Sequence, residues 1–257
     1  MRYYGNKYVR DFLQHLVAAE IANSSISKNA IFKGGTMLRC TRADYRFSED
    51  LDYDIRGISS SDFLESVDMI LTKISKQHDV DMWLDSNYSN PLPPINDTPV
   101  IFWQTSKEED YIVLEYRELS NDNPIETAIL RLQPRYPEIT NTSPVLCYTE
   151  DQVLCSKFNC LSNRQKGRDI YDFYFLAKSD KNMTLAWDKY ISTLSFYEKV
   201  AVEPDKLVIS LKKRRNDFAE EWVKDQRGGF ILPTYNFQPT WDFMVKKIKS
   251  LPGMLRL

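Results

Sequence analysis

The spacing of apolar residues predicts a chain whose first part alternates helices with short strands. Apolar positions three and four residues apart indicate amphipathic helices at 8–22 and 59–76. The buried stripe of the second helix is expected to comprise Phe63, Val67, Ile70, Leu71 and Ile74. A short apolar run at 30–32 leads into KGGT at 33–36, after which Met37 can begin a helix. This order is typical of a strand, a tight turn and a helix N-terminus.

Residues 50–55 alternate strictly between acidic and apolar side chains. Asp50, Asp52 and Asp54 share one face of the predicted strand, and the residues between them are apolar. The apolar face can therefore pack in a core while the acidic face lines a cleft.

Further strands are expected between residues 101 and 132. Runs at 101–103 and 111–119 form a hairpin around 106–110, and 129–132 adds another strand. Within 111–119, Glu115 and Arg117 share a face. The proline-rich stretch at 87–98 predicts a loop.

A change of composition at 134–144 to Pro, Thr and Asn predicts a domain boundary, which divides the chain into 1–140 and 141–257. The second part is expected to be helical, and the sequence TEDQ at 149–152 fits a capping box at its first helix. The later helices are expected at 168–177, 184–200, 205–225 and 239–250.

The composition excludes several classes of function. The net charge of −2 argues against a protein coated in positive potential for generic nucleic-acid binding. The four Cys form no CxxC pair and the two His lie far from them, which argues against a zinc site, and neither His has a nearby nucleophile. No signal-like start and no apolar window of membrane length are found, so we expect a cytoplasmic protein without a membrane partner.

The candidate chemistry lies in the first part of the chain. Two carboxylates at i and i+2 on a strand point the same way, so Asp50 and Asp52 can share a divalent cation, Mg²⁺ or alternatively Mn²⁺. Glu115, on a later strand, is the candidate third ligand of a two-metal site, chosen from strand phase alone. Gly34, Gly35 and Thr36 at a helix start offer backbone N–H groups to a phosphate.

Two blocks of sequence together resemble the AbiEii/AbiGii-type nucleotidyltransferases, which include the MenT-type toxins. The first block reads IFKGGTMLR at 31–39 and RFSEDLD at 46–52. The second has Lys157 followed by RDIYD at 168–172. The match covers about residues 30–55 and 150–177.

The resemblance implies an α/β (α+β) fold: a polymerase-β-like nucleotidyltransferase core with a small mixed sheet, followed by a helical C-terminal domain that completes the nucleotide cleft. Together with the strand phase of Glu115, it gives a catalytic set of Asp50, Asp52, Glu115, Lys157 and Asp172, the first three being metal ligands. The nucleotide-binding set comprises Lys33, Gly34, Gly35, Thr36, Arg46, Ser48, Lys157, Arg168 and Asp169.

The resemblance also implies an activity: transfer of a nucleoside monophosphate from a nucleoside triphosphate (NTP) to an acceptor. The expected acceptor is RNA, in particular the 3′ end of tRNA, and the expected role is that of a toxin, restrained by an antitoxin protein, in a toxin–antitoxin or phage-defence pair. Two alternatives stay open: transfer to a small molecule or a protein hydroxyl, and a non-catalytic nucleotide-binding regulator.

Some residues have two interpretations at this point. Arg46 can contact a phosphate or pair with an acid of its own loop, and Arg39 is equally ambiguous. Lys157 can hold a triphosphate or cover apolar surface with its stem. The basic run at 212–215 is a solvated helix face or a docking surface for a polynucleotide.

Overall fold

The computed structural model describes residues 7–43, 45–86, 90–91, 94–95, 98–140, 143–178, 180–196 and 203–252. The chain divides into two compact units. The sheet unit comprises residues 1–123 and 127–148, and the helical unit comprises 124–126 and 149–257. Across the described residues, every helix is too short or too polar to traverse a lipid bilayer.

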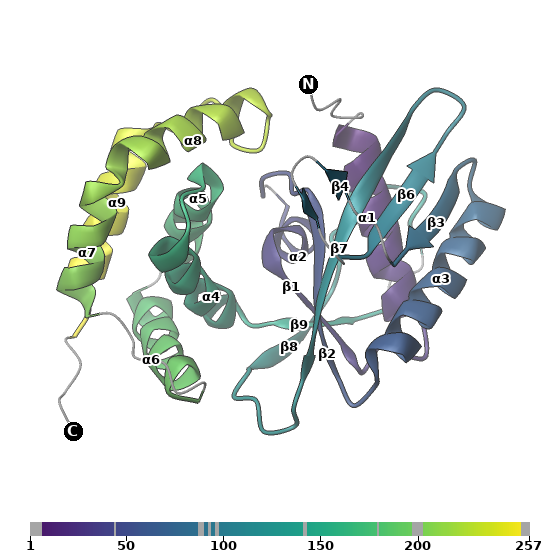
Figure 1. Cartoon of the computed structure of the whole chain (residues 1–257), viewed down its shortest axis with the longest axis horizontal. Helices are drawn as coiled ribbons and strands as arrows, with labels where there is room; N and C mark the ends of the chain where they lie inside the picture. The colour runs from purple at the N-terminus through teal and green to yellow at the C-terminus, as the bar shows by residue number, and fades with distance from the viewer. Residues whose placement is uncertain are drawn as a thin grey trace. The chain divides into compact units, whose positions relative to one another are not determined.

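The sheet unit is built around a mixed sheet that has seven strands in the described part of the chain (Figure 1). Their order is β3-β6-β7-β2-β1-β9-β8, which places β2 in the middle. The pairs β2–β7 and β1–β9 are parallel, whereas the other neighbours are antiparallel. The strands are β1 (Ala30–Lys33), β2 (Asp50–Arg56), β3 (Asp81–Asp85), β6 (Val100–Gln104), β7 (Glu109–Leu119), β8 (Thr127–Leu130) and β9 (Val145–Tyr148).

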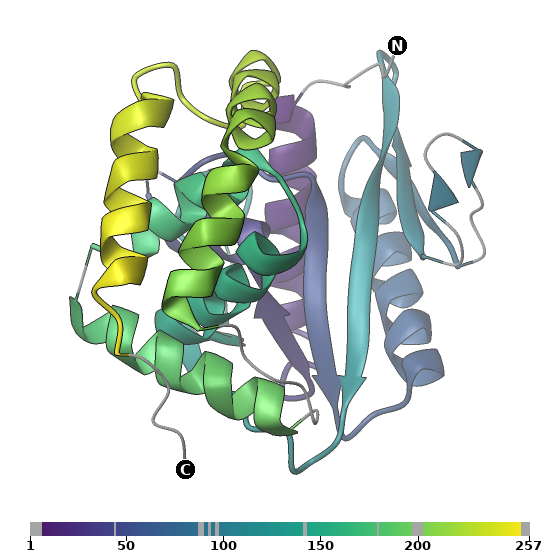
Figure 2. The ribbon, with the colours of Figure 1, turned by 60° about the vertical axis from the view of Figure 1, so that its left-hand side comes forward.

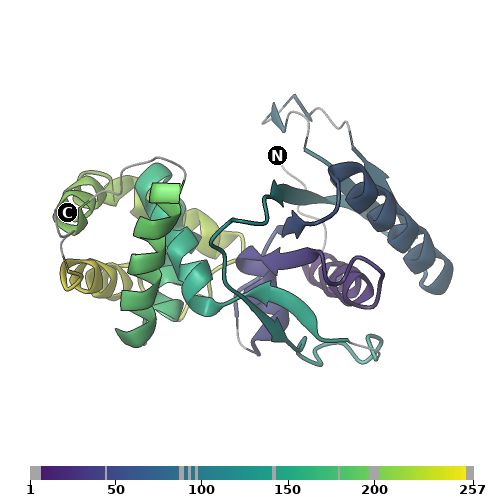
Figure 3. The ribbon, with the colours of Figure 1, turned by 90° about the horizontal axis from the view of Figure 1, so that it is seen from below.

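Three helices accompany this sheet: α1 (Lys7–Ala22), α2 (Gly34–Thr41) and α3 (Ser60–Gln77). Helices α1 and α3 lie side by side on one side of the sheet (Figures 1 and 3). The buried residues of α3 are the five of the predicted stripe, which confirms that prediction. Phe63 contacts Tyr53 of β2 and Tyr116 of β7, with ring centroids 6.0 and 5.3 Å apart, so the face of the sheet that bears these tyrosines forms the core.

The helical unit contains α4 (Glu150–Asn163), α5 (Gly167–Leu176), α6 (Asp180–Phe196), α7 (Pro204–Lys213), α8 (Arg215–Arg227) and α9 (Phe237–Lys249). Phe158 of α4 packs edge-to-face on Trp187 of α6, with centroids 5.2 Å apart. At the start of α5, a Cβ on Gly167 would lie 2.4 Å from the Cα of Trp222, so only glycine permits this approach of α5 to α8. Figure 2 shows these helices in a second view.

The start of α4 confirms the predicted cap but not the full capping box. The Thr149 side chain accepts a hydrogen bond from the Gln152 backbone N–H at 3.3 Å. The Gln152 side chain accepts instead from the backbone N–H of Glu126, also at 3.3 Å. The reciprocal half of the box is therefore replaced by a tie to the segment 124–126.

The mixed α/β class predicted from the sequence is confirmed, although several elements differ from their predictions. The boundary between the units follows Tyr148, because β9 pairs with β1 and β8 and so belongs to the sheet. Strands β3 and β9 were not predicted, and α2 begins at Gly34 instead of Met37. Helix 205–225 is two helices, separated at Arg214.

Two predictions fall partly outside the described residues. The loop predicted at 87–98 is described only at residues 90–91, 94–95 and 98, where β4 (Asn90–Pro91) pairs with β5 (Pro94–Ile95). Of the helix predicted at 184–200, residues 197–200 are not described.

Candidate functional site

The turn between β1 and α2 lies directly against the carboxylate of Asp52. Gly34 has a φ of +75°, a backbone conformation that favours glycine. A Cβ at Gly34 would lie 2.1 Å from Oδ2 of Asp52, so a side chain there would occupy the position of the carboxylate oxygen. The absence of a side chain at Gly34 thus lets the acid and the start of the helix come together.

Helix α2 presents its positive end at this turn. The first backbone N–H groups of a helix have no partner within the helix, and the helix dipole adds partial positive charge. Here those groups belong to Gly34, Gly35 and Thr36. The hydroxyl of Thr36 is buried and donates to the backbone carbonyl of Asp50, which ties the turn to β2. A phosphate contact from Thr36 would therefore come from its backbone N–H.

Arg46 and Ser48 reach the same helix end. A Cβ at Gly35 would lie 2.8 Å from Nη2 of Arg46 and 2.8 Å from Oγ of Ser48. Arg46 is buried, and its Nη1 donates to the carbonyl of Phe47 at 2.8 Å. A guanidinium beside the positive end of a helix is electrostatically unfavourable by itself, but both attract an anion. The hydrogen bond to the Phe47 carbonyl is thus compatible with a phosphate contact, and pairing of Arg46 with an acid stays a prediction.

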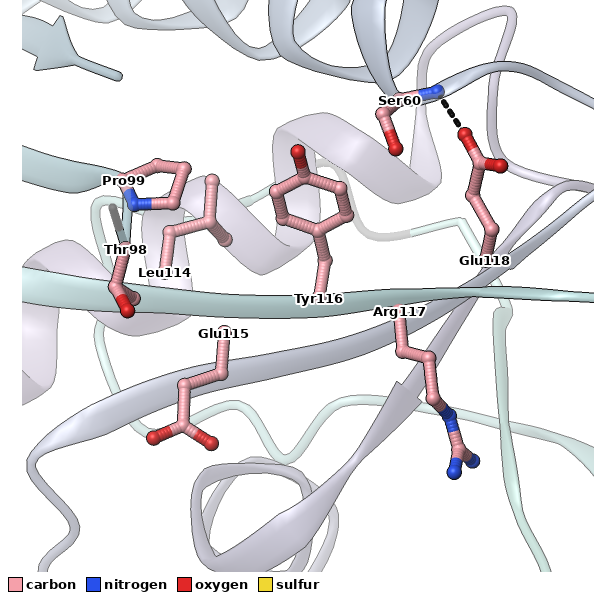
Figure 4. A pocket seen from close by; sticks show the side chains of 8 residues that line it. All are labelled: Ser60, Thr98, Pro99, Leu114, Glu115, Tyr116, Arg117 and Glu118. Atoms are coloured by element: carbon pink, nitrogen blue, oxygen red, sulfur yellow. Dashed lines mark hydrogen bonds between the residues drawn. The ribbon is translucent and has the colours of Figure 1, made fainter. Parts of the chain in front are cut away.

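The acidic residues of β2 follow the predicted alternation. Leu51, Tyr53 and Ile55 are fully buried, and the aspartates face the other side of the sheet. The register pairs Asp52 with Lys33 of β1 and with Glu115 of β7. Glu115 is exposed, and it extends to the side of β7 opposite Tyr116 (Figure 4).

Among the described residues, no three acidic, His or Cys side chains converge on a ready-made metal position. Asp50 and Asp52 nevertheless offer the hard oxygen donors that Mg²⁺ prefers, beside a turn suited to phosphate, and Mg²⁺ commonly takes its remaining ligands from phosphate oxygens and water. The donor chemistry therefore fits a divalent cation. Glu115 as a third ligand stays a prediction.

Asp54 differs from the other two aspartates because it is fully buried in an ionic cluster. Its Oδ1 lies 2.6 Å from Nζ of Lys33, and its Oδ2 lies 3.0 Å from Nη2 of Arg117 and accepts from the hydroxyl of Tyr148. Burial raises the pKa of Asp54, but the charges and hydrogen bonds of Lys33 and Arg117 outweigh burial, and the net effect lowers it. The expectation of an open acidic face is therefore wrong at Asp54. We name Asp54, Lys33, Arg117 and Tyr148 the Asp54 cluster.

Arg39, for which the sequence left a phosphate contact and a structural pairing open, forms a structural ion pair with Asp11. Its Nε and Nη2 bind the carboxylate of the buried Asp11 at 3.0 and 2.9 Å, and its guanidinium stacks over the ring of Phe47 at 4.3 Å. Tyr136 donates to the same carboxylate at 2.6 Å. Arg39 thereby joins α1, α2 and the loop that carries Arg46.

In the helical unit, Lys157 lies between the two aspartates of α5. Its Nζ is 3.1 Å from Oδ1 of Asp169 and 2.7 Å from Oδ2 of Asp172, and both carboxylates are fully buried. Arg164 forms a second pair with Asp169 at 2.8 Å. Burial raises the pKa of Asp169, yet Lys157 and Arg164 outweigh it and lower the pKa to about 2. These four residues, which we name the Lys157 cluster, connect α4 to α5.

The other basic candidates of the helical unit have partners of their own. The guanidinium of Arg168 lies over the ring of Phe230 at 5.5 Å, and its backbone N–H donates to Asp225 at 2.8 Å. The run at 212–215 is not one continuous helix face: Arg214 donates to the carbonyl of Leu161 at 2.7 Å, and Arg215 lies over Phe237 at 5.5 Å. Two of the four charges of this run thus support packing within the unit.

A central sheet, a glycine turn that opens a helix, and alternate aspartates beside that turn are the features that the resemblance to nucleotidyltransferases led us to expect. The chain belongs to the nucleotidyl transferase AbiEii toxin family of type IV toxin–antitoxin systems, whose pattern matches residues 15–247. It is therefore a nucleotidyltransferase, and the family resemblance inferred from the sequence is confirmed. A search of curated protein sequences finds no match.

Solved structures confirm the fold. MenT4, a nucleotidyltransferase toxin from Mycobacterium tuberculosis H37Rv, superposes with a TM-score of 0.69 at 14% identity, covering 96% of this chain and 85% of that chain. JHP933 from Helicobacter pylori superposes with a TM-score of 0.57 at 16% identity. The match covers 95% of this chain and 90% of the JHP933 chain. At these identities the likeness concerns the fold alone.

Proposed function

We propose that this chain transfers a nucleoside monophosphate from an NTP to the 3′ end of an RNA, with tRNA as the leading candidate, in a reaction that depends on Mg²⁺. The observation that carries the proposal is the contact between the glycine turn and Asp52. At this contact, a helix end suited to a phosphate lies beside a carboxylate suited to a metal ion. Membership of the toxin family supports an NTP substrate and an antitoxin protein as partner.

The residues around the turn would bind the phosphates and the divalent cation with different groups. Backbone N–H groups at 34–36 and the guanidinium of Arg46 would hold the terminal phosphates of the NTP, with the hydroxyl of Ser48 beside them. Asp50 and Asp52 would hold the divalent cation. When bound, that cation lowers the pKa of the attacking hydroxyl and neutralises charge on the departing pyrophosphate.

The reaction forms one bond and breaks one. The acceptor oxygen bonds to the α-phosphorus of the NTP, and the bond from that phosphorus to the bridging oxygen of the β-phosphate breaks. Pyrophosphate leaves and the proton of the acceptor hydroxyl is released. Since attacking and leaving oxygens lie roughly in line, the acceptor must approach from the side of the α-phosphate opposite the glycine turn.

Roles for the helical unit stay predictions. By family resemblance, Lys157 contacts the triphosphate, and Asp169 or Asp172 lies on the other side of the nucleotide cleft; Arg168 lies in the same motif. The contacts described above lie within the helical unit. They therefore support a structural role for Lys157 and Asp172. A phage-defence role for the toxin is likewise a proposal that rests on the family.

The test is a labelling experiment with the full chain. Each of the four α-³²P-labelled NTPs is incubated with Mg²⁺ and total RNA, and the products are separated by size. We expect label in RNA of tRNA length with the native chain, and a loss of at least about 10²-fold with Asp52→Ala, because a group acting on transition-state charge is removed. Omission of the divalent cation or addition of EDTA should have the same effect.

Two results would count against the proposal. Label in a small molecule or in protein, but not in RNA, would favour the other acceptor classes. NTP binding without transfer to RNA, protein or small molecules would indicate a regulator. Arg131→Gln, an exposed change just beyond β8, is the matched control and should label RNA as the native chain does.

A further inference from the structure

The Asp54 cluster lies on the same face of the sheet as the carboxylates that the proposed reaction uses. Asp54 follows Asp52 by two residues on β2, and its register partner on β7 is Arg117, two residues beyond Glu115. Successive alternate residues of a strand are about 7 Å apart and share a face. The cluster is therefore the immediate neighbour of Asp52 along the sheet.

The cluster and the glycine turn lie at opposite ends of the acidic row. The turn is fixed at the Asp50 end, where the Thr36 hydroxyl binds the Asp50 carbonyl. The ammonium of Lys33 extends the other way, past its register partner Asp52 to Asp54. Asp52 thus separates two positively charged features: the N-terminus of α2 on one side, and Lys33 with Arg117 on the other.

The charges and exposure of the cluster indicate more than a structural ion pair. Its two cations share one carboxylate, so the formal charges of Lys33, Asp54 and Arg117 sum to +1, next to the carboxylates of Asp52 and Glu115. Asp54 is 0% exposed, whereas the side chains of Lys33 and Arg117 are 22% and 51% exposed. The carboxylate is hidden, Lys33 is mostly covered, and the guanidinium side chain of Arg117 is half exposed.

The surface along the part of β7 that carries Arg117 is hollowed. A cavity of about 510 Å³ runs along Leu114–Glu118 of β7, and its lining includes both Glu115 and Arg117. In Figure 4, Glu115 and Arg117 extend to one side of β7, and Tyr116 and Glu118 extend to the other. Most of the hollow lies on that second side, so access to Arg117 from the side of the reacting carboxylates rests on the exposure of its side chain, which is 51%.

We propose that Lys33 and Arg117, oriented by Asp54, form a second phosphate subsite that binds the phosphate next to the attacking hydroxyl of a polynucleotide acceptor. This inference rests on the proposed function. Because the triphosphate is held at the glycine turn, in-line attack brings the acceptor from the opposite side of Asp52, where the cluster lies. Asp54 is a positioning residue, and it acts through the two cations.

The subsite favours acceptors that carry a phosphate next to the attacking hydroxyl. A guanidinium that faces outward gains charge-assisted hydrogen bonds from a phosphodiester, but gains little from an uncharged sugar or a protein hydroxyl. The acceptor is therefore a nucleic-acid end whose last internucleotide linkage is charged. Binding at this subsite does not depend on the identity of the base, because phosphate contacts position a strand without reading its sequence.

The experiment uses the full chain and two synthetic RNA hairpins with unpaired 3′ ends. They are identical except that the last linkage is a phosphodiester in one and a neutral methylphosphonate in the other. Label transfer from the preferred NTP is measured with the native chain, Arg117→Gln, Lys33→Gln and the control Arg131→Gln. KM is determined separately for hairpin and NTP, and thermal melting verifies that each variant is folded.

We expect the neutral linkage to lower kcat/KM of the native chain about tenfold, as loss of a charge-assisted contact should. Arg117→Gln should lose about as much on the charged hairpin, mainly through KM for RNA, and should not distinguish the two hairpins further. Lys33→Gln should follow the same pattern more weakly, and Arg117→Lys should restore part of the activity. Arg131→Gln should behave as the native chain does.

Several outcomes would overturn the subsite, and they differ from failure of the proposed function. If the native chain labels both hairpins equally well, it has no subsite that distinguishes a charged linkage from a neutral one. If Arg117→Gln raises KM for the NTP and not for RNA, the Arg117 guanidinium binds the triphosphate instead of the acceptor. If the native chain labels neither hairpin while it labels another acceptor class, the RNA acceptor itself is wrong, and the subsite is wrong with it.

Discussion

The two units of the protein each bury acids beside cations, but in different proportions: two cations share one carboxylate in the Asp54 cluster, and two cations share two carboxylates in the Lys157 cluster. In the sheet unit, Asp54 is shared by Lys33 and Arg117, whose side chains are 22% and 51% exposed. In the helical unit, Lys157 is 8% exposed and lies between two buried carboxylates. The first arrangement presents positive charge outward, and the second neutralises a lysine inside. The same kinds of residue thus leave a half-exposed guanidinium in one unit and a covered ammonium in the other.

Accessibility of charge in the two units does not follow the sequence motifs. Lys157 stands in a motif and invites a catalytic role, whereas Arg117 stands in none. The contacts give Arg117 the more accessible charge. The following changes test this difference, from the largest expected effect on stability to the smallest.

Replacing Lys157 with Met should have the largest effect. Removal of one partner from a buried ion pair leaves an uncompensated charge and costs about 3–5 kcal/mol. For a domain of this size each kcal/mol lowers Tm by about 2–4 °C, so thermal unfolding should shift by roughly 10 °C. Lys212→Met, an exposed change on α7, is the control and should leave Tm within about 2 °C. If Lys157→Met melts as the native chain does but no longer binds NTP, Lys157 binds the ligand and is not needed for helix packing.

Acid should weaken the Lys157 cluster within a defined pH range. The pKa of Asp169 is lowered from 3.8 to about 2, so the folded state releases this proton more readily than the unfolded state does. The resulting stability is present above pH 4 and is lost as the pH falls from about 4 to about 2; its size is about 2 kcal/mol. Urea unfolding of the native chain and of Asp169→Asn, measured from pH 7 to pH 2, should show a difference that shrinks over this range. A difference that stays constant with pH would mean that Asp169 is not ionised in the folded protein.

Alanine at the two glycines of the turn should separate two functions of the sheet unit. At Gly34, φ is +75° and the new Cβ would lie 2.1 Å from Asp52, so Gly34→Ala should cost about 1–2 kcal/mol of stability and lower kcat sharply. At Gly35, the new Cβ meets the ends of two flexible side chains, Arg46 and Ser48, at 2.8 Å. Gly35→Ala should therefore mainly raise KM for the NTP, with stability nearly unchanged. Steady-state kinetics of both variants would show whether the turn holds the carboxylate and the phosphate separately; identical defects would contradict this division.

Arg117→Gln should have the smallest effect on stability, about 1 kcal/mol or less, because half of its side chain is exposed and its pair with Asp54 is screened by solvent. Thermal unfolding measures this change, and the hairpin experiment above measures its effect on activity. A loss of stability as large as that of Lys157→Met would mean that both clusters are structural.

The sequence predicted those features that depend on residues close together in the chain. The stripe of α3 and the alternation of β2 follow from helical and strand periodicity, and both are confirmed. The turn at 33–36 also follows from local chemistry, since glycine at a positive φ can begin a helix close to a neighbouring strand.

Features that depend on distant pairing were not predictable in the same way. Strand phase gave the face of Glu115, but its position beside Asp52 depends on a parallel register between strands far apart in sequence. Strand β9 is four residues long and follows a stretch rich in Pro and Thr, so its pattern was too short to identify. The break at Arg214 was also missed, because the apolar spacing continues through it while its guanidinium binds the end of α4.

The sequence by itself determined the family, the amphipathic helices, the glycine turn and the pair Asp50 and Asp52. These are encoded by neighbouring residues, whose spacing fixes which side chains share a face. Tertiary structure alone decided that Asp54 is buried with Lys33 and Arg117, that Arg39 binds Asp11, and that Lys157 lies between two carboxylates. The reason is physical: the charge of a side chain is a property of its sequence, whereas its exposure and its partners depend on which distant strands and helices pack beside it.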